Sequence, residues 1–281
     1  MKHLKHFSLC SGIGGLDLAA EWAGFETVAQ CEIDEYASKV LAKNFKGVPN
    51  LHDIRTVTNE RLAEFGIDGK EITVISAGFP CQPYSLAGKG RGDRDSRDLW
   101  GEVARVLGEI KPHWFVGENT PGLFARQNQR FFRRVLDDLT ALGYSVGWGI
   151  WGACDVGAPH RRERVFFIAN RSIPDNYGVR QLQSERSIEK IGHRVGDLRE
   201  DVSDPNGYAK RRLPCGEKTT QSVFGIGRRN AGAEWWQTEP NVDRVVDGVP
   251  ARVDRLRCLG NAVVPAQAYP IFKAIADYYK K

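Results

Sequence analysis

One cysteine of this chain stands between two prolines. Pro80, Cys81, Gln82 and Pro83 follow an apolar run and precede a loop rich in Gly, Ser and Lys. The prolines restrict the backbone on both sides of the thiol. A thiol held at the end of a strand can act as a nucleophile when a neighbour lowers its pKa or accepts its proton. A cysteine packed in the core is the alternative. It fits poorly beside two prolines and a polar loop, so Cys81 is the candidate nucleophile.

A carboxyl group ends the next apolar run. The sequence HWFVGEN, residues 113–119, is typical of a buried strand and places Glu118 near its carboxyl end. Because the carboxyl ends of parallel strands meet at one edge of a sheet, Glu118 and Cys81 are expected at the same edge. A carboxyl group in such an apolar setting has a raised pKa and can serve as an acid. A thiol beside an acid would, next to an adenosine-containing cofactor, suit attack on a heterocycle with protonation of a ring nitrogen.

Two arginines stand just before a later apolar run. Arg162 and Arg164 are two positions apart in PHRRERVFFIA, and strand alternation would point both to one side. Arginine suits oxygen acceptors and phosphates. Taken alone, this pattern fits a solvated basic edge better than a binding site.

A glycine-rich turn near the N-terminus indicates a ligand site. FSLCSGIGGLDLA places Gly12, Gly14 and Gly15 between an apolar run and a helical pattern. Glycine allows positive φ and close backbone approach, although such glycines often only make the turn. Glu32 lies at the end of the second strand-like run, where an acid commonly binds ribose hydroxyls, and Asp53 could accept a hydrogen bond from an adenine amino group. Together they suit an adenosine-containing cofactor without a pyrophosphate. Singly, a solvated glutamate or an N-cap aspartate explains each equally well.

The elements that must position these residues alternate between strand and helix. Strand-like runs occupy 5–10, 26–33, 71–79, 113–119, 144–151 and 164–170, and helical patterns occupy 16–25, 35–45, 98–110 and 129–143. This alternation predicts an α/β fold with a doubly wound, mostly parallel sheet. No helical pattern separates the last two strands, which could form an antiparallel pair at the sheet edge.

Periodicity is lost after residue 170. We therefore predict a catalytic and cofactor-binding domain at 1–170, a second domain at 171–254 and a C-terminal segment at 255–281 that returns to the first domain. Most of the middle segment, residues 171–229, has an excess of basic over acidic residues and few aromatic residues. It is either a partly disordered surface insertion or a small recognition module, and composition does not separate the two. The last segment predicts a tight loop followed by a helix.

Composition sets the remaining limits. Hydrophobic residues make up 41% of the chain and charged residues 27%, with a net charge of +5. The mildly basic balance permits a polyanionic partner without demanding one. No apolar run is long enough to span a membrane and no signal-peptide core follows the first residues, so the cytosol is expected. The six cysteines show no zinc-type spacing, so neither a metal site nor a disulfide framework is expected.

In combination, these segments resemble the DNA (cytosine-5) methyltransferases. FSLCSGIGG, GFPCQPYSLAGKG, DSRDLW, GEN, RRER and GNAVVP stand in the order of that family's motifs and cover roughly two-thirds of the chain. The resemblance implies a class I S-adenosylmethionine-dependent methyltransferase fold with a small, irregular target-recognition domain. It also implies double-stranded DNA as the partner of a monomeric enzyme, in a bacterial or phage-infected cell and in the setting of restriction and modification.

The resemblance also implies roles for individual residues. Cys81 would attack carbon 6 of a flipped-out cytosine, Glu118 would engage N3 and Arg162 the O2 carbonyl, with Arg164 beside them. A flap from Tyr84 to about residue 97 would close over the DNA. The residues that would contact S-adenosyl-L-methionine are Cys10, Gly12, Gly14, Gly15, Glu32, Asp53, Ile54, Leu99, Asn261 and Ala262.

Two other functions stay open. One branch of the same family methylates transfer RNA, but its nucleophile loop usually differs from GFPCQP and its companion Cys-Phe-Thr motif is not found here. An inactive DNA-binding or regulatory relative is the alternative from another class. The intact Cys81, Glu118 and Arg162 argue against it. The target sequence is not readable from residues 171–250.

Overall fold

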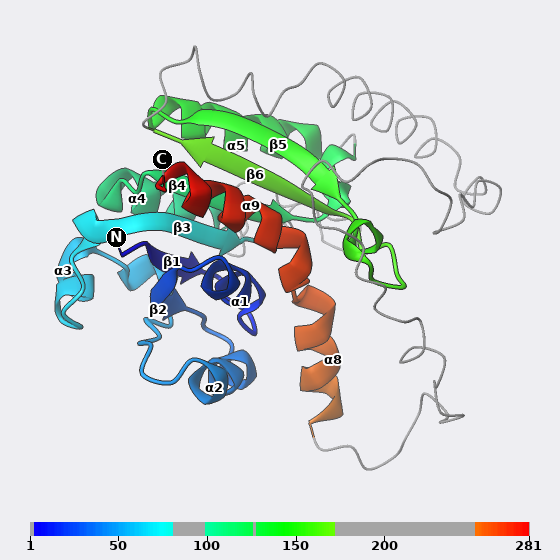
Figure 1. The fold of residues 1–281 in the computed structure, drawn as a ribbon, viewed down its shortest axis with the longest axis horizontal. Coiled ribbons are helices and arrows are strands. Elements are labelled where there is room, and N and C mark those ends of the chain that lie inside the picture. The colour runs from blue at the N-terminus through cyan, green and yellow to red at the C-terminus, as the bar shows by residue number, and fades with distance from the viewer. Residues whose placement is uncertain (1–2, 81–98, 126–127, 172–250, 281) are drawn as a thin grey trace.

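The computed structural model describes residues 3–80, 99–125, 128–171 and 251–280. They form a six-stranded sheet with helices on both faces (Figure 1). Cys81, the flap and residues 172–250 lie outside the described residues.

The sheet order is β2-β1-β3-β4-β6-β5. Its strands are β1 (Lys5–Leu9), β2 (Glu26–Cys31), β3 (Ile72–Gly78), β4 (Trp114–Asn119), β5 (Ser145–Trp151) and β6 (Arg164–Asn170). The first four strands pair in parallel, whereas β6 is antiparallel to both β4 and β5. The predicted mostly parallel sheet and the antiparallel pair at its edge are therefore confirmed.

Helices cover the sheet because its strands are apolar on both faces. On one face, α1 (Gly15–Trp22) and α9 (Pro265–Tyr278) pack over Val74, Val116 and Phe166 (Figure 1). On the other face, α4 (Trp100–Ile110) and α5 (Gln129–Ala141) pack over Phe7 and Phe115. One apolar layer on each side of a mostly parallel sheet makes the doubly wound architecture. The C-terminal helix α9 thus contacts the start of the chain.

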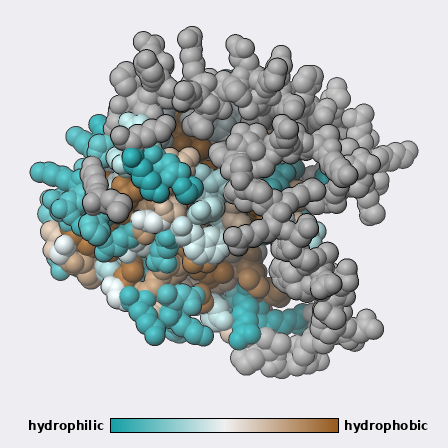
Figure 2. Space-filling model, in the orientation of Figure 1, coloured by the Kyte–Doolittle hydropathy of each residue, from teal (hydrophilic) through white to brown (hydrophobic). Residues whose placement is uncertain are grey.

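Shorter elements connect these layers. They are α2 (Glu35–Asn44), α3 (Asn59–Ala63) and the 3-10 turns η1 (Ile54–Thr56), η2 (Gly69–Glu71), η5 (Pro121–Phe124) and η7 (Ala153–Val156). Hydrophilic and apolar residues are interspersed over the visible described surface (Figure 2).

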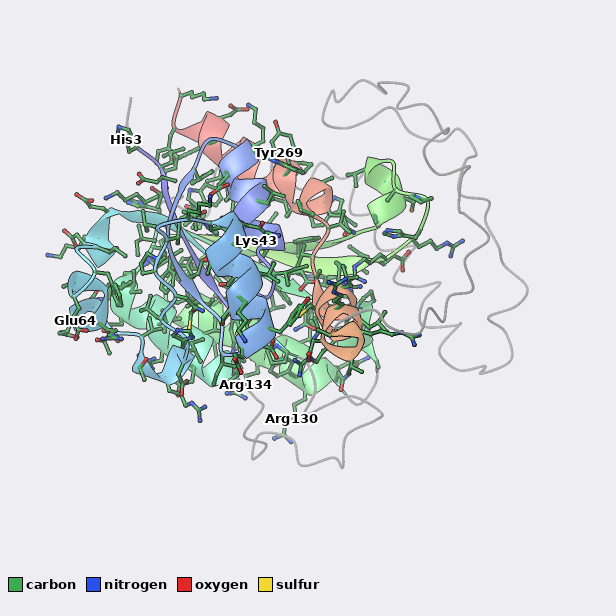
Figure 3. The ribbon with its side chains drawn as sticks, turned by 90° about the horizontal axis from the view of Figure 1, so that it is seen from below. His3, Lys43, Glu64, Arg130, Arg134 and Tyr269 are labelled. Carbon is green, nitrogen blue, oxygen red and sulfur yellow. The ribbon has the colours of Figure 1, made fainter. Side chains whose placement is uncertain are left out.

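The helix α8 (Arg252–Asn261) differs from the sequence expectation. The predicted tight loop before the last helix is wrong for Leu259, Gly260 and Asn261, because they form the last turn of α8. None of the residues of α8 is buried, so the helix has no apolar stripe that faces the core. It lies beside the start of α2, where Arg257 pairs with Asp34 at 2.6 Å (Figure 3).

Candidate active site

The carboxyl ends of β3 and β4 lie side by side. Gly78, the last residue of β3, is in register with Glu118 of β4. One residue further on, the Asn119 side-chain amide donates a hydrogen bond to the carbonyl of Phe79, at 3.1 Å. This bond fixes the backbone that leads to Cys81, which follows Gly78 by three residues in the sequence. The described residues thus carry Glu118 to the strand end from which the thiol segment departs.

Glu118 is a buried acid with an arginine partner. Its Oε1 lies 2.8 Å from Nε of Arg164, and the two side chains are only 9% and 13% exposed. Burial raises the pKa of Glu118 to about 7, while the positive charges of Arg164 and Arg162 oppose that rise. The carboxyl group can therefore both hold and release a proton near neutral pH, as the sequence predicts for an acid at this position.

Arg162 is held by the C-terminal part of the chain. Its Nη2 donates to the carbonyl of Gly260 at 2.8 Å, to that of Leu259 at 3.3 Å and to that of Ala262. The expected strand alternation does not apply to it, because β6 begins only at Arg164 and Arg162 has a φ of 35°. The two arginines therefore reach Glu118 differently. Arg164 forms an ion pair with it, and Arg162 acts through its charge.

The three glycines of the first turn have different surroundings. A Cβ on Gly14 would lie 2.3 Å from the ring of Phe45, and one on Gly15 would lie 2.4 Å from the carbonyl oxygen of Val263. Both glycines serve internal packing, and Gly15 joins the turn to the segment after α8. A Cβ on Gly12, in contrast, would meet nothing within 4 Å, and its φ is +57°. Gly12 is therefore the glycine at which a ligand could approach the backbone.

Glu32 and Asp53 both lie near the carboxyl end of β2, but their carboxylates have different hydrogen-bond partners. Glu32 accepts hydrogen bonds at 2.8 Å from the backbone N–H of Gly12 and from that of Asp34. Each carboxylate oxygen keeps further acceptor capacity, so ribose hydroxyls could still bind. Asp53 uses Oδ1 to cap η1 and to accept from Nε of Arg55 at 2.9 Å, which lowers the pKa of Asp53. The N-cap explanation thus holds for Oδ1 of Asp53.

The other predicted cofactor residues lie on several separate segments. Cys10 has a φ of 50°, and burial, together with the charge of Glu32, raises its pKa to about 12. Ile54 is buried beside Asp53, and Leu99 precedes α4 directly. Asn261 is exposed at the end of α8, and Ala262 offers its carbonyl to Arg162.

A buried polar network lies beneath the glycine turn, and sequence reasoning missed it. Asp17 of α1 is fully buried and accepts from the Ser8 hydroxyl at 2.7 Å and from the Gln30 amide at 3.0 Å. The Ser8 hydroxyl also bonds the hydroxyl of Ser11, next to Gly12, at 2.5 Å. Burial raises the pKa of Asp17 to about 6. An acid inside the apolar pattern LDLAAEW was the signal that could have revealed it.

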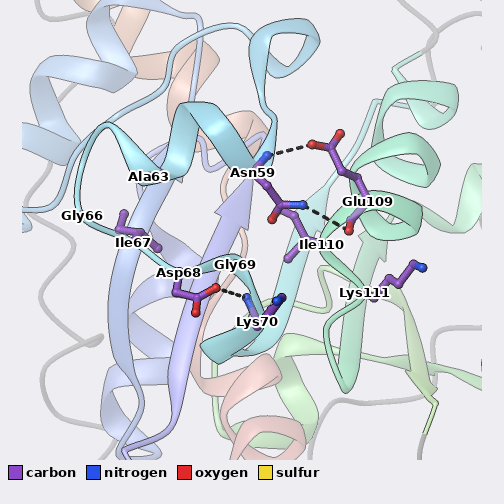
Figure 4. Close-up of a pocket in the computed structure, with 10 residues that line it drawn as sticks. All are labelled: Asn59, Ala63, Gly66, Ile67, Asp68, Gly69, Lys70, Glu109, Ile110 and Lys111. Atoms are coloured by element: carbon purple, nitrogen blue, oxygen red, sulfur yellow. Dashed lines mark hydrogen bonds between the residues drawn. The ribbon is translucent and has the colours of Figure 1, made fainter.

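A surface hollow of about 740 Å³ lies away from these residues. Asn59, Gly69, Lys70 and Glu109 line part of it, at the end of the sheet where β3 begins (Figure 4). Ligands of doubly wound folds bind at the opposite, carboxyl edge. The hollow is therefore separate from the candidate site.

Two features are absent from the described ranges. Within them, no three His, Cys, Asp or Glu side chains gather in a way that could hold a metal ion. No helix there has both the length and the apolar character needed to cross a membrane.

Known proteins resemble this chain over much of its length. Residues 4–226 match the family model described as C-5 cytosine-specific DNA methylase. The type II methyltransferase M.NgoBI of Neisseria gonorrhoeae is 38% identical over 168 residues, which cover 58% of this chain and 50% of that protein. M.FnuDI of Fusobacterium nucleatum is 37% identical over 202 residues, which cover 71% and 57%. The chain thus spans about half the length of the curated relatives it matches.

Among solved structures, one similar chain is described as a candidate DNA modification methyltransferase encoded within a prophage of E. coli. The TM-score is 0.52 with 31% sequence identity, and the match covers 59% of this chain and 46% of that chain.

Proposed function

Because the chain belongs to the C-5 cytosine-specific DNA methylases and has the class I methyltransferase fold, we propose that it methylates carbon 5 of cytosine in duplex DNA, with S-adenosyl-L-methionine as methyl donor. The observation that carries the proposal is the buried Glu118, with its pKa near 7, at the strand end where the Cys81 segment begins. An acid that titrates near neutral pH beside a thiol suits addition to a pyrimidine ring.

The described residues around Gly12 fit S-adenosyl-L-methionine. The open side of Gly12 lets a ligand approach the backbone, and Glu32 and Asp53 offer carboxylate oxygens to hydroxyl and amino donors. Carboxylates there suit adenosine and disfavour a phosphate. Cys10, Gly14, Gly15, Ile54, Leu99, Asn261 and Ala262 would complete the surroundings of this ligand. When bound, S-adenosyl-L-methionine supplies an electrophilic methyl group.

The reaction begins with Cys81. Its thiolate forms a bond to carbon 6, and the electrons of the carbon 5–carbon 6 double bond move toward carbon 4 and N3. Glu118 donates its proton to N3, so the adduct carries no net charge on the ring. Carbon 5 then takes the methyl group. Loss of the carbon 5 proton to water and release of Cys81 restore the aromatic ring, while N3 returns its proton to Glu118.

The two arginines hold the reacting groups. Arg162 would donate to the O2 carbonyl of the cytosine. Only its Nη2 makes hydrogen bonds to the described residues, so Nε and Nη1 remain for O2. Arg164 pairs with Glu118 and keeps the carboxyl group oriented. The chemistry requires that the cytosine leave the base stack. The flap would cover the extruded base, and residues 171–254 would form the domain that recognises the target sequence.

One experiment separates this function from its alternatives. Purified protein is incubated with methyl-labelled S-adenosyl-L-methionine and either unmethylated bacterial genomic DNA or bulk transfer RNA. The proposal expects label in DNA as 5-methylcytosine, and none after Cys81→Ala, although the variant still binds the cofactor. Label in transfer RNA alone would favour the RNA-methylating branch. Methylation by Cys81→Ala near the wild-type rate would remove Cys81 from the mechanism.

A further inference from the structure

A buried glutamine links the C-terminal helix to the backbone of Arg162. Gln267, in the first turn of α9, is 2% exposed. Its Nε2 donates to the carbonyl of Trp151, at 2.8 Å, and to the carbonyl of Arg162, at 2.9 Å. These two carbonyls flank the connection between β5 and β6. One side chain therefore holds both ends of the loop that carries Arg162.

The amide of Gln267 is oriented by these two acceptors. Carbonyl oxygens can only accept, so the nitrogen of the amide must face them. The amide oxygen, Oε1, is buried without a hydrogen-bond partner among the described residues. A buried acceptor without a partner destabilises a fold, and the two hydrogen bonds donated by Nε2 offset that cost. A glutamine at this place is therefore better explained by what its donors hold than by stability alone.

Arg162 requires such support at both its backbone and its side chain. Its φ of 35° is a conformation that residues with a Cβ adopt reluctantly. The carbonyl groups of Leu259, Gly260 and Ala262 hold its guanidinium from the same C-terminal segment that carries Gln267. Residues 259–267 thus fix Arg162 from two directions.

We propose that Gln267 is a positioning residue for methyl transfer, which holds the Arg162 loop so that the guanidinium faces Glu118 and the O2 atom of the bound cytosine. The inference rests on the proposed function, and it assigns to α9 a part in the catalytic step itself. Gln267 does not touch the base; it acts through Arg162.

The position of Arg162 has an electrostatic consequence that can be measured. The charged groups that act on Glu118 within the described residues are Arg164 and Arg162, and both lower its pKa. If the Arg162 loop shifts, part of this effect is lost and the pKa of Glu118 rises. The Glu118-dependent limb of the pH–rate profile then moves to higher pH. A loss of general stability would not move that limb.

The test compares Gln267→Met with a control on the same helix. Methionine keeps the volume and removes both donors. Lys273→Met removes the surface pair of Lys273 with Asp277 and leaves the Arg162 loop untouched. For Gln267→Met we expect kcat on unmethylated genomic DNA to fall about 10- to 100-fold, the scale of a small misplacement of a catalytic group. The dissociation constant of S-adenosyl-L-methionine should stay within about twofold, because the glycine turn is unaffected. Lys273→Met should match the wild type.

A double-mutant cycle and hydrogen exchange make the test decisive. If Gln267 acts through Arg162, Gln267→Met should cost nothing further in an Arg162→Ala background. Amide exchange in residues 152–163 should be faster in Gln267→Met and unchanged in Lys273→Met. The proposal would be overturned if the rate losses of Gln267→Met and Arg162→Ala multiplied in the double variant. Unchanged amide exchange in residues 152–163 of Gln267→Met would also overturn it.

The exchange measurement needs no activity, so it separates the two proposals. A wild-type protein that does not methylate DNA would contradict the proposed function, while faster exchange in the variant would still show that Gln267 holds the Arg162 loop. Should Gln267→Met fail to fold, Gln267→Asn retracts the same amide by one methylene and carries the same expectations.

Discussion

Replacing Glu118 by glutamine should change the pH dependence of the reaction as well as its rate. Glutamine keeps the size of the side chain and can still donate to N3, but it cannot transfer a proton. The expected loss in kcat is about two to four orders of magnitude, the usual contribution of an acid–base group. Cofactor affinity should change little, because Glu118 lies on β4 and the glycine turn follows β1.

The size of the pH effect follows from the burial of Glu118. Its pKa of about 7 compares with an ordinary value of 4.5. The difference of about 2.5 units, roughly 3 kcal/mol, raises the protonated fraction above pH 7 by about 300-fold. Catalysis needs a protonated acid and a deprotonated thiol, and an ordinary cysteine has a pKa of about 8.5. The plot of wild-type rate against pH should therefore be bell-shaped, with its maximum between about pH 7 and 8.5.

The assay is label transfer to unmethylated DNA at saturating cofactor between pH 6 and 10. Wild-type activity should rise and then fall, whereas Glu118→Gln should rise with pH to a plateau, because only the thiol still titrates. Circular dichroism must show that the variant is folded, since Arg164 loses its buried partner. A variant that keeps the falling limb, or a kcat within tenfold of the wild type, would refute the acid role of Glu118.

Three further predictions concern the cofactor turn, the buried acid and target choice. Gly12→Ala should weaken S-adenosyl-L-methionine binding and lower Tm by only a few degrees, through the strain of alanine at a φ of +57°. Gly15→Ala should lower Tm further, with a smaller effect on binding, because its Cβ would lie 2.4 Å from the Val263 carbonyl oxygen. The reverse pattern in a binding and melting experiment would contradict this assignment. Asp17 is favoured in its neutral form, so its contribution to stability is fully present below about pH 4 and is lost as pH rises through about 6. Asp17→Asn should therefore make the free energy of unfolding, measured with denaturant, less dependent on pH between pH 4 and 6. An unchanged pH dependence would count against burial of Asp17 as its cause. Replacing residues 171–250 by the matching segment of a related enzyme should change which cytosine is methylated, as read by bisulfite sequencing. Methylation at the original site would place recognition elsewhere.

The sequence predicts the sheet and the location of the acid because these depend on local patterns. Apolar runs such as HWFVGEN make strands, and Glu118 ends one of them, so its place at the carboxyl edge follows from chain order. The glycine turn and Glu32 are found in the same way, and the structure joins them by a hydrogen bond.

The remaining features depend on contacts between distant segments. Gln267 and Arg162 are separated by 105 positions, and no pattern in either segment indicates that they meet. The orientation of Arg162 could not be predicted either, because its positive φ breaks the alternation that the sequence suggests. The helix α8 was not predicted although Val253, Leu256 and Leu259 recur three residues apart, and all three are exposed in the structure. Such features arise from tertiary packing, which overrides local propensity.

The covalent intermediate is the central claim, and a fluorinated substrate tests it most directly. The target site is first identified by bisulfite sequencing of DNA from an expressing host. Duplex with 5-fluorocytosine at that site can be attacked and methylated, but carbon 5 then has no proton to lose. With S-adenosyl-L-methionine present, the protein should become joined to the DNA in a complex that resists denaturation. Mass spectrometry should place the bond on Cys81, in the peptide GFPCQPYSLAGK. The complex should be absent without the cofactor and in Cys81→Ala. Full methylation of the ordinary duplex with no such complex on its fluorinated form would contradict the carbon 5 mechanism.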